Sequence, residues 1–320
     1  MDSTQIPDLS AWGMPAPKDV RRPAGGTNNS VFLLDESYVL RIYDNLDAGQ
    51  IAAEHRLLAD LNAWHDRADL PFAVPAPLPT MDGRTTDGSA ALFPYVAGRP
   101  ADYNRLGEIE LAGEALGVLD GVLAELSDTL PPREWNGRFD ALHPAVDDIA
   151  QLYDELDRSM PGDPGVAWFG DHAARTERAY LAVVPTLPAQ IIHGDFALSN
   201  VLVHDGRVAA VLDFEVARTG PRVDDPVAAI GVTTRFGTPG DLDRLAALRR
   251  GYARAVTLSP AEEAAIPTLL RNRALQSAVW RAGRWRLGLA GLDEVRHRLE
   301  RGVELERWLA RPEFADLWEV

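Results

Sequence analysis

The sequence predicts an α+β protein with a small sheet-plus-helix lobe over residues 1–96 and a larger, mainly helical lobe over residues 97–320. A strand hairpin near the N-terminus is followed by a helical segment and another strand, and a second hairpin lies near residue 200. Long helical segments fill most of the second half. At 320 residues the chain is long enough for two packed lobes around one cleft.

The first hairpin is predicted from two apolar runs, 31–34 and 38–43, which a three-residue turn joins. The loop before it, residues 25–30, reads Gly-Gly-Thr-Asn-Asn-Ser. Glycines let a backbone approach phosphates closely, and successive backbone N–H groups bind anions. The loop is therefore a candidate phosphate-binding segment, with a plain turn as the alternative.

A helix is predicted over residues 47–66, because Ile51, Leu58 and Leu61 form one apolar row at helical spacing. Glu54 falls on the same row. A carboxylate on a buried stripe needs a partner to offset its desolvation. The alternative is a solvated glutamate at the edge of the stripe. Further along, residues 90–96 are predicted to form a strand that ends in a connector before a helix over about 105–127.

The most specific segment is IIHGDFALSNVLVHDGRVAAVLDFEVAR, residues 191–218. Asp195 is followed by Asn200 after five positions and by Asp213 after eighteen. Strands at 201–203 and 208–212, joined by an Asp-Gly turn, place Asn200 and Asp213 before and after one hairpin. This set suits phosphoryl transfer, in which one Asp orients the attacking hydroxyl while the Asn and the second Asp hold magnesium. Turn and capping residues are the alternative.

The spacing matches the kinase set H-R-D-x-x-x-x-N followed by D-F-G, with Gly194 in place of the Arg and Glu215 in place of the final Gly. With His-Gly-Asp and Asp-Phe-Glu, the chain resembles the aminoglycoside phosphotransferase and choline kinase family of small-molecule kinases, which includes homoserine kinase of the second type. The resemblance extends from about residue 25 to the C-terminal helices. It implies a bilobal, protein-kinase-like fold, in which the catalytic hairpin belongs to the larger lobe.

The resemblance also implies the roles of individual residues. Asp195 would be the catalytic base or acceptor-positioning group, and Asn200 and Asp213 would bind Mg2+. Arg41 stands where kinases carry the phosphate-binding lysine, and Glu54 would pair with it. The connector after the 90–96 strand would be the hinge that bonds the adenine of ATP, with GTP as an alternative nucleotide. The implied nucleotide-binding residues are Gly26, Asn28, Asn29, Ser30, Arg41, Glu54, Phe93, Pro94, Tyr95 and Val96.

Two further acids and a histidine are expected to support the site. In the family, an Asp after the catalytic hairpin bonds the backbone of the catalytic loop. Asp225 aligns best with it, and Asp224 is the alternative. His193 is expected to play a similar supporting part.

The acceptor site is less specific in the sequence. Arg273, Trp280 and Arg284 share one face of a helix predicted over about 269–289, while Leu275, Val279 and Ala282 share a core face. In the family, the late helices line the acceptor site, so Arg273, Trp280 and Arg284 are candidate substrate residues, with Trp280 as a buried aromatic wall. Packing between helices is the alternative. A second candidate is the acidic run at 147–157, whose alternative is a solvated helix face.

Composition limits the class of protein. There is no cysteine, so disulfides and thiol chemistry are excluded, and no apolar run is long enough to span a membrane. The N-terminus lacks the features of a signal peptide, which predicts a cytoplasmic protein. The protein is expected to be a monomer or a homodimer. The formal net charge of −16 argues against a nucleic-acid partner. The acidity mildly favours a cationic or neutral substrate, with solubility as the alternative explanation.

Together these observations predict an ATP-dependent O-phosphotransferase that acts on a hydroxyl of a small molecule. An antibiotic of the aminoglycoside, nucleoside or glycosylated type is the favoured acceptor, which would make the protein a resistance kinase. The alternatives are a metabolic kinase of homoserine or a choline-like alcohol, and a nucleotide-binding pseudokinase that acts as a scaffold.

Overall fold

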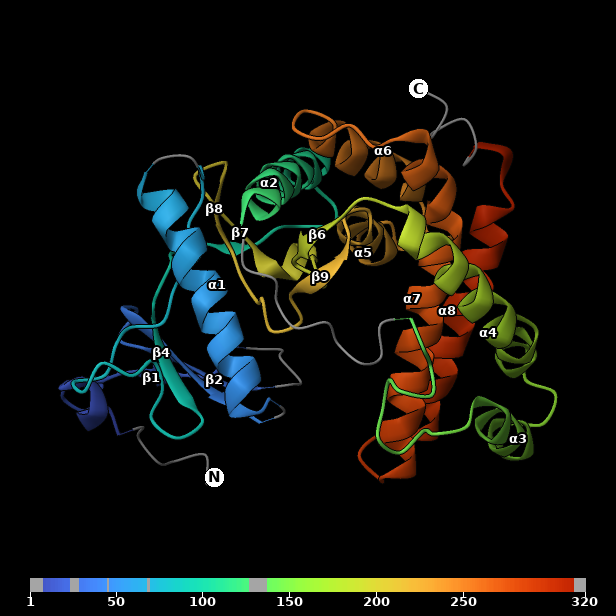
Figure 1. Cartoon of the computed structure of the whole chain (residues 1–320), viewed down its shortest axis with the longest axis horizontal. Helices are drawn as coiled ribbons and strands as arrows, with labels where there is room; N and C mark the ends of the chain where they lie inside the picture. The colour runs from blue at the N-terminus through green and yellow to red at the C-terminus, as the bar shows by residue number, and fades with distance from the viewer. Residues whose placement is uncertain (1–7, 24–28, 45, 68–69, 127–136, 314–320) are drawn as a thin grey trace. The chain divides into compact units, whose positions relative to one another are not determined.

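The fold is described from a computed structural model, which describes residues 8–23, 29–44, 46–67, 70–126 and 137–313. Contacts divide the chain into two compact units. The first contains residues 1–101 and 199–217, and the second contains residues 102–198 and 218–320. Figure 1 labels the helices α1 to α8 and most of the strands.

The first unit begins with the 3-10 turn η1 (Ser10–Trp12) and a four-stranded antiparallel sheet. The strands follow in the order β1 (Val20–Arg21), β2 (Asn29–Leu34), β3 (Tyr38–Tyr43) and β4 (Ala90–Pro94). Positive φ angles at Asp35 and Glu36 form the tight turn between β2 and β3. The core of the unit on this sheet is apolar, with buried side chains Leu9, Trp12, Phe32, Leu34, Leu40 and Leu92.

Helix α1 (Ala48–Asp66) connects β3 to the segment before β4. Its start is fixed by a capping box, in which the Asp47 side chain accepts from the Gln50 N–H and the Gln50 side chain accepts from the Asp47 N–H. Ile51, Leu58 and Leu61 are buried, as their helical spacing predicted. Glu54 is buried on the same helix, at 4% exposure, so it is not a solvated residue at the edge of the stripe.

The catalytic hairpin belongs to a second sheet of the first unit. Its strands are β5 (Arg99–Pro100), β7 (Val201–His204) and β8 (Arg207–Val211), in the order β5-β7-β8. Ala73 adds backbone hydrogen bonds to Ala209 and Val211. Because these bonds join the hairpin to residues 73 and 99–101, it is grouped with the N-terminal residues, whereas the sequence placed it in the larger lobe. The lobe boundary at residue 96 stays a prediction.

The second unit is mainly helical, as predicted. Its helices are α2 (Leu106–Glu125), α3 (Ile149–Ser159), α4 (Pro164–Val183), α5 (Asp224–Thr233), α6 (Asp241–Tyr252), α7 (Pro260–Arg286) and α8 (Leu292–Leu309). The unit also contains the short 3-10 helices η2 (Val184–Thr186) and η3 (Leu198–Asn200), the latter ending in the first unit, and the paired strands β6 (Ala189–Ile192) and β9 (Arg218–Pro221). Helix α7 begins nine residues before the predicted start, because Ser259 and Glu262 form a capping box there.

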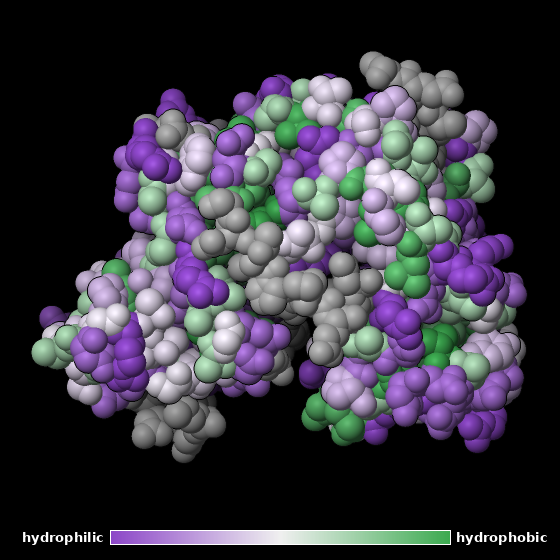
Figure 2. Space-filling view, viewed as in Figure 1, coloured by the Kyte–Doolittle hydropathy of each residue, from purple (hydrophilic) through white to green (hydrophobic). Residues whose placement is uncertain are grey.

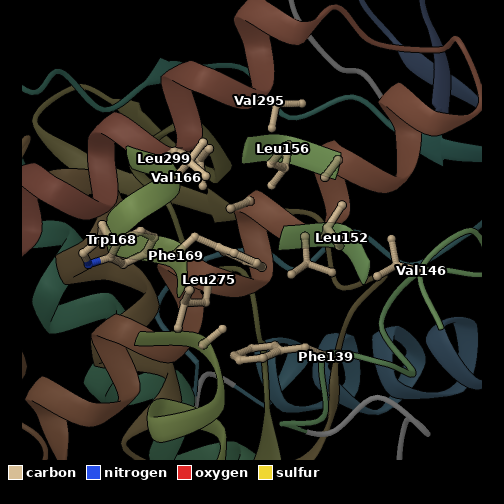
Figure 3. Packing of buried hydrophobic residues seen from close by; sticks show 14 of the residues in the cluster. Phe139, Val146, Leu152, Leu156, Val166, Trp168, Phe169, Leu275, Val295 and Leu299 are labelled. Atoms are coloured by element: carbon tan, nitrogen blue, oxygen red, sulfur yellow. The ribbon is translucent and has the colours of Figure 1, made fainter. Parts of the chain in front are cut away.

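The core of the second unit lies among α3, α4, α7 and α8. Figure 3 shows Phe139, Phe169, Leu275 and Leu299 converging from different segments. Leu275, Val279 and Ala282 are fully buried in this core, as predicted. The packing therefore fixes which face of α7 turns away from the core, and Arg273, Trp280 and Arg284 lie on that other face.

The face drawn in Figure 2 is mixed in polarity. On the face shown in Figure 2, hydrophilic and hydrophobic residues are interspersed among the coloured residues. No helix in the described ranges combines the length and apolar character needed to cross a membrane.

Candidate active site

An arginine surrounded by carboxyl groups is the main polar feature of the first unit. Arg41 lies on β3 and donates through Nη1 to Glu54 Oε1 at 3.0 Å. Its Nη2 donates to Asp213 Oδ1 at 3.0 Å and to Glu215 Oε2 at 2.7 Å. Asn29, at the start of β2, donates through Nδ2 to the same Glu215 oxygen at 2.6 Å. The predicted pair of Arg41 with Glu54 is therefore present, and it belongs to a larger cluster.

The charges in this cluster oppose one another. Burial disfavours the charge of Arg41, but Glu54, Asp213 and Glu215 outweigh that effect and raise the pKa of Arg41 above its ordinary value. Burial also raises the pKa of Glu54 from 4.5 to about 7, although Arg41 acts in the opposite direction. The side chain of Glu54 is only 3% exposed, against 39% for Asp213. Arg41 therefore stays charged, while its most buried partner is the easiest to protonate.

This pKa shift predicts a pH-dependent contribution to stability. Below pH 4.5, Glu54 is protonated in both the folded and the unfolded chain. As the pH rises toward 7, the unfolded chain ionises first, so the folded state loses stability. Glu54→Gln cannot ionise and removes this loss. We expect the free energy of unfolding of Glu54→Gln, relative to the original chain, to rise by more than about 1 kcal/mol between pH 4.5 and 8.

Urea denaturation of both proteins at several pH values measures this difference. Asp47→Asn, at the exposed start of α1, is a control for general effects of acid removal. A difference between Glu54→Gln and the original chain that does not depend on pH would contradict the assignment.

Next to the arginine cluster, a chain of polar groups runs from the buried Tyr43 and His55 to the exposed Thr85. The Tyr43 hydroxyl and His55 Nε2 are 3.0 Å apart, and His55 Nδ1 and the Thr85 hydroxyl are 2.7 Å apart. Burial, helped by Arg41, lowers the pKa of His55 to about 4, so the ring is neutral near pH 7. The edge of this ring packs against Phe93, with ring centroids 6.0 Å apart. Phe93, one of the predicted nucleotide-binding residues, is 7% exposed and therefore buried.

The predicted hinge, residues 93–96, has the Val96 N–H as a candidate backbone donor. The Tyr95 N–H is bound to the Ser37 carbonyl at 2.9 Å. The Val96 N–H makes no backbone hydrogen bond within the described ranges, and Pro94 has no N–H. Among the predicted hinge residues, Val96 is therefore the residue able to donate to a nucleotide base. Ser30 of the predicted phosphate loop bonds Asp44 at 3.3 Å, and Gly26 and Asn28 lie outside the described residues.

Asn200 and Asp213 lie at the open end of the hairpin β7–β8. The Leu212 N–H donates to the Asn200 carbonyl at 2.8 Å, which brings the two segments together. Asp213 has a φ of 72°, a left-handed conformation that Asp and Asn adopt more readily than most residues. The end of β8 thus turns sharply at the residue predicted to bind metal.

The donor chemistry of this pair fits magnesium. Asn200 and Asp213 supply amide and carboxylate oxygens, which are hard ligands, and Mg2+ usually takes one or two carboxylates and fills its remaining positions with phosphate oxygens and water. Within the part of the chain that the structure describes, no group of three or more His, Cys, Asp or Glu side chains is arranged to hold a metal by itself. The pair therefore fits an ion that a nucleotide helps to bind.

The catalytic loop, residues 193–195, lies in the second unit, and a carboxylate on α5 binds its backbone. The carboxylate of Asp225, in the first turn of α5, accepts the His193 N–H and the Gly194 N–H, both at 2.7 Å. Gly194 has a φ of 82°, which favours glycine at this position of the motif. His193 is fully buried, and its Nδ1 accepts the Asp195 N–H at 3.3 Å. The supporting parts predicted for Asp225 and His193 are thus present.

Arg273 on α7 reaches the catalytic loop directly. It donates through Nη1 to the Gly194 carbonyl at 3.0 Å and through Nη2 to Asp195 Oδ1 at 3.2 Å. The side chain of Asp195 remains 55% exposed and that of Arg273 24% exposed. Arg273 therefore holds one carboxylate oxygen of Asp195, while the side chain as a whole stays accessible.

Trp280 and Arg284 continue the same face of α7. Trp280 was expected to form a buried aromatic wall, but it is 40% exposed. Trp280 is exposed because its position on α7 turns away from the core. Its ring and the ring of His143 are perpendicular, with their centroids 4.9 Å apart. Burial and then the nearby Arg284 lower the pKa of His143. The face thus combines an exposed aromatic ring with a cation.

The acidic run at 147–157 has structural partners. The Asp148 side chain caps α3 by accepting the N–H groups of Ala150 and Gln151. Glu155 accepts from Arg286 at 2.9 Å. These contacts favour a helix start and an inter-helix ion pair over an acceptor site.

Glu215 was noted in the sequence only as a departure from D-F-G. The structure shows that it joins Arg41 and Asn29, residues more than 170 positions away. The departure from glycine was itself the signal, because an acid at that position needs a nearby partner once it is partly buried.

Comparison with known proteins agrees with this geometry. Residues 19–265 match the family model described as phosphotransferase enzyme family. The chain belongs to this phosphotransferase family. The phosphotransferase is an enzyme, a small-molecule kinase that acts on a hydroxyl acceptor, and its first unit carries the antiparallel sheet and its second the helices of a protein-kinase-like fold.

Three similar proteins illustrate the range of the family. The phosphotransferase is 30% identical to a homoserine kinase of Caulobacter sp. (strain K31) over 285 residues, which cover 82% of this chain and 80% of the relative. Its fold is similar to that of a microcompartment-associated aminopropanol kinase, with a TM-score of 0.67, 19% identity and 94% and 95% of the two chains covered. It is also similar to an amicoumacin kinase in complex with AMP-PNP and Ca2+, with a TM-score of 0.62, 15% identity and 91% and 89% covered.

Proposed function

We propose that the protein transfers the γ-phosphoryl group of ATP to the hydroxyl of a small acceptor that carries a carboxylate, with homoserine as the first acceptor to test. The observation that carries this proposal is the cationic face of α7, where Arg273 contacts the catalytic loop and Arg284 follows three turns later. The homoserine kinase relative, aligned over most of both chains, supports the same acceptor.

The first unit is proposed to bind the nucleotide. Arg41 pairs with phosphate oxygens, and a guanidinium can do so with two parallel hydrogen bonds. Glu54 and Glu215 orient Arg41, and the loop that includes Gly26, Asn28, Asn29 and Ser30 covers the phosphates. The hinge residues 93–96 hold the base, with the Val96 N–H as donor. ATP is the proposed nucleotide, and GTP is the alternative.

Asn200 and Asp213 are proposed to hold Mg2+, which neutralises the charge of the nucleotide phosphates when it is bound. Arg41 offsets part of the charge of Asp213. The left-handed turn at Asp213 fixes the direction of its carboxylate, so the side chain is positioned before a nucleotide binds.

Asp195 is proposed to accept the hydrogen of the acceptor hydroxyl as the oxygen attacks phosphorus and ADP leaves. Arg273 binds one carboxylate oxygen of Asp195, and the side chain as a whole is 55% exposed, so the carboxylate is accessible to the hydroxyl. The same guanidinium adds positive charge beside the transferred group. Catalysis then depends on positioning and charge stabilisation rather than on covalent chemistry.

The charge of the α7 face distinguishes between acceptor classes. A carboxylate would be attracted to Arg284 and could bind it bidentately, whereas a polyamine such as an aminoglycoside would be repelled. The acidic run at 147–157 does not reverse this preference, because Asp148 and Glu155 are engaged in structural contacts. The cationic face is opposite in sign to the formal net charge of the protein, which is −16.

A second candidate is phosphorylation of an antibiotic, and Trp280 is the observation that favours it. An aromatic ring that is 40% exposed offers a stacking surface to a ring-bearing acceptor of glycosylated or nucleoside type. The likeness in fold to the amicoumacin kinase is compatible with such an acceptor. A nucleotide-binding scaffold without activity is a third class, and turnover of ATP with any acceptor would exclude it.

An acceptor panel with labelled ATP and Mg2+ tests the proposal. The panel contains homoserine, choline, ethanolamine, an aminoglycoside and a glycosylated antibiotic. We expect homoserine to be phosphorylated with the highest kcat/KM. Phosphorylation of an antibiotic with homoserine untouched would favour the second candidate, and no transfer to any acceptor would favour the scaffold.

The α7 face gives a separate prediction about the acceptor. Arg284→Ala should raise the KM of the acceptor by about tenfold and leave the KM of ATP unchanged, because a charge-assisted contact contributes roughly 1.5 kcal/mol. Trp280→Ala should raise the acceptor KM less for homoserine than for a ring-bearing acceptor. Steady-state kinetics with each substrate varied in turn measures both effects.

Arg281→Ala is the matched control for these variants, because Arg281 lies on the same helix but is paired with Glu294 at 2.7 Å. If the KM of ATP moves instead, or if neither KM moves, the face is a packing surface and the acceptor site lies elsewhere.

A further inference from the structure

Two buried carboxyl groups, those of Asp225 and Asp120, lie near the catalytic loop, and only Asp225 binds the backbone of the loop. Asp225 is fully buried and binds the backbone N–H groups of His193 and Gly194. Asp120, on α2, is 1% exposed and lies within hydrogen-bonding reach of Asp225. A second buried acid beside the first is costly unless something offsets its charge.

Among the residues that the structure describes, no cation forms an ion pair with Asp120. Its Oδ2 accepts the Tyr252 hydroxyl at 2.7 Å, while its Oδ1 is buried and has no hydrogen-bond partner in the described part of the chain. Arg222 is near enough to act on it electrostatically, but the guanidinium of Arg222 is bound to Glu262 at 3.0 and 2.7 Å. Asp120 therefore faces a tyrosine hydroxyl and another carboxyl group.

A proton on Asp120 would resolve this arrangement. Two adjacent buried carboxylates repel each other, so one of them holds a proton. The two oxygens of Asp225 accept the backbone N–H groups of His193 and Gly194. Asp120 accepts only one hydrogen bond and has an oxygen left without a donor. Burial raises the pKa of Asp120 well above its ordinary value, and Asp225 adds to the rise.

We propose that Asp120 is a positioning residue that keeps its proton at neutral pH and donates it in a hydrogen bond to Asp225. Asp225 is thereby held in the orientation in which it binds the backbone of His193 and Gly194. The position of Asp195, the next residue, depends on that backbone. The inference rests on the proposed role of Asp195 in the transfer reaction.

The surroundings of Asp120 leave few other groups that could titrate with it. Tyr252 faces it from the end of α6, Asp225 from the start of α5, and Arg222 from the segment before α5. From β6, the uncharged Gln190 side chain donates to the Asp120 backbone carbonyl at 2.9 Å. Close packing of α2 on α6 fixes Tyr252, since a Cβ at Gly113 or Gly251 would collide with the backbone of the facing helix.

Two substitutions separate a neutral hydrogen-bond donor from a charged acid. Asp120→Asn keeps an acceptor for Tyr252 and a donor for Asp225, so kcat should stay within about threefold of the original enzyme. Asp120→Ala removes both, so kcat should fall by more than about tenfold with the KM of ATP unchanged, because one lost buried hydrogen bond costs roughly 1–3 kcal/mol. Equal losses in both variants, or no loss in Asp120→Ala, would overturn the proposal.

Infrared difference spectroscopy tests the proton directly and needs no substrate. The spectrum of the original protein minus that of Asp120→Asn, taken at about pH 8.5, should contain the carbonyl band of a protonated carboxyl group. Glu54 is ionised there, because its pKa is about 7. Absence of the band would overturn the proposal even in an active enzyme. If the proposed reaction is wrong instead, the band remains while no acceptor is phosphorylated.

Discussion

Asp195→Asn is expected to lower kcat by about two to four orders of magnitude, the usual range for loss of a general base. An amide cannot accept the proton of the acceptor hydroxyl. Its oxygen can still accept from Arg273, so the loop should keep its position. Nucleotide binding should be unchanged, because the groups assigned to it, such as Arg41 and Asp213, belong to the first unit.

Asp205→Asn is the matched control for this experiment. Asp205 lies in the exposed turn of the hairpin β7–β8, with a side chain that is 90% exposed, and its φ of 49° is tolerated by Asn. The two variants are compared by steady-state turnover and by titration with nucleotide. Activity of Asp195→Asn within a few-fold of the original enzyme would remove Asp195 from the catalytic role.

Replacement of Asp213 is expected to abolish magnesium-dependent nucleotide binding. The carboxylate carries the charge that holds the ion, and its loss also leaves Arg41 with one fewer acid partner. Asp213→Asn is the more informative variant, since Asn tolerates the positive φ of 72° whereas Ala adds a backbone cost of roughly 1–2 kcal/mol. If nucleotide affinity falls more in Asp213→Ala than in Asp213→Asn, the difference measures the cost of the positive φ for Ala.

Isothermal titration calorimetry with ATP, in magnesium and in a chelator, measures this effect. The original protein should bind more tightly with magnesium, and Asp213→Asn should bind equally weakly in both. Unchanged affinity and turnover in Asp213→Asn would mean that Asp213 is only a turn residue.

The elements that position the site could be predicted because their signals are local. The hairpin at 31–43, the helix with Glu54 on its apolar row and the Asp-Gly turn at residues 205 and 206 each follow from short patterns of residue type. The partner of Glu54 was predicted by the resemblance to a family, and the buried position of Glu54 explains physically why a partner is needed.

Contacts between residues far apart in the chain were harder to predict from the sequence. Glu215 and Arg41 are 174 positions apart, and Arg273 and Asp195 are 78 apart. Such pairs depend on how helices and strands pack, which periodicity does not encode. The exposure of Trp280 also depends on packing, because the core side of α7 is set by α3, α4 and α8. The sequence correctly placed Arg273, Trp280 and Arg284 on one face of α7, but it wrongly predicted that Trp280 is buried.

The proposed acceptor is a hydroxyl compound that the protein recognises by its carboxylate. Comparing homoserine with 3-aminopropan-1-ol tests this proposal most directly, since the two share the hydroxyl and the amine and differ only in the carboxylate. With ATP and Mg2+, kcat/KM should be at least about tenfold higher for homoserine, and Arg284→Ala should reduce that ratio toward one. Equal kcat/KM values for the two acceptors, or a ratio that Arg284→Ala leaves unchanged, would contradict the account.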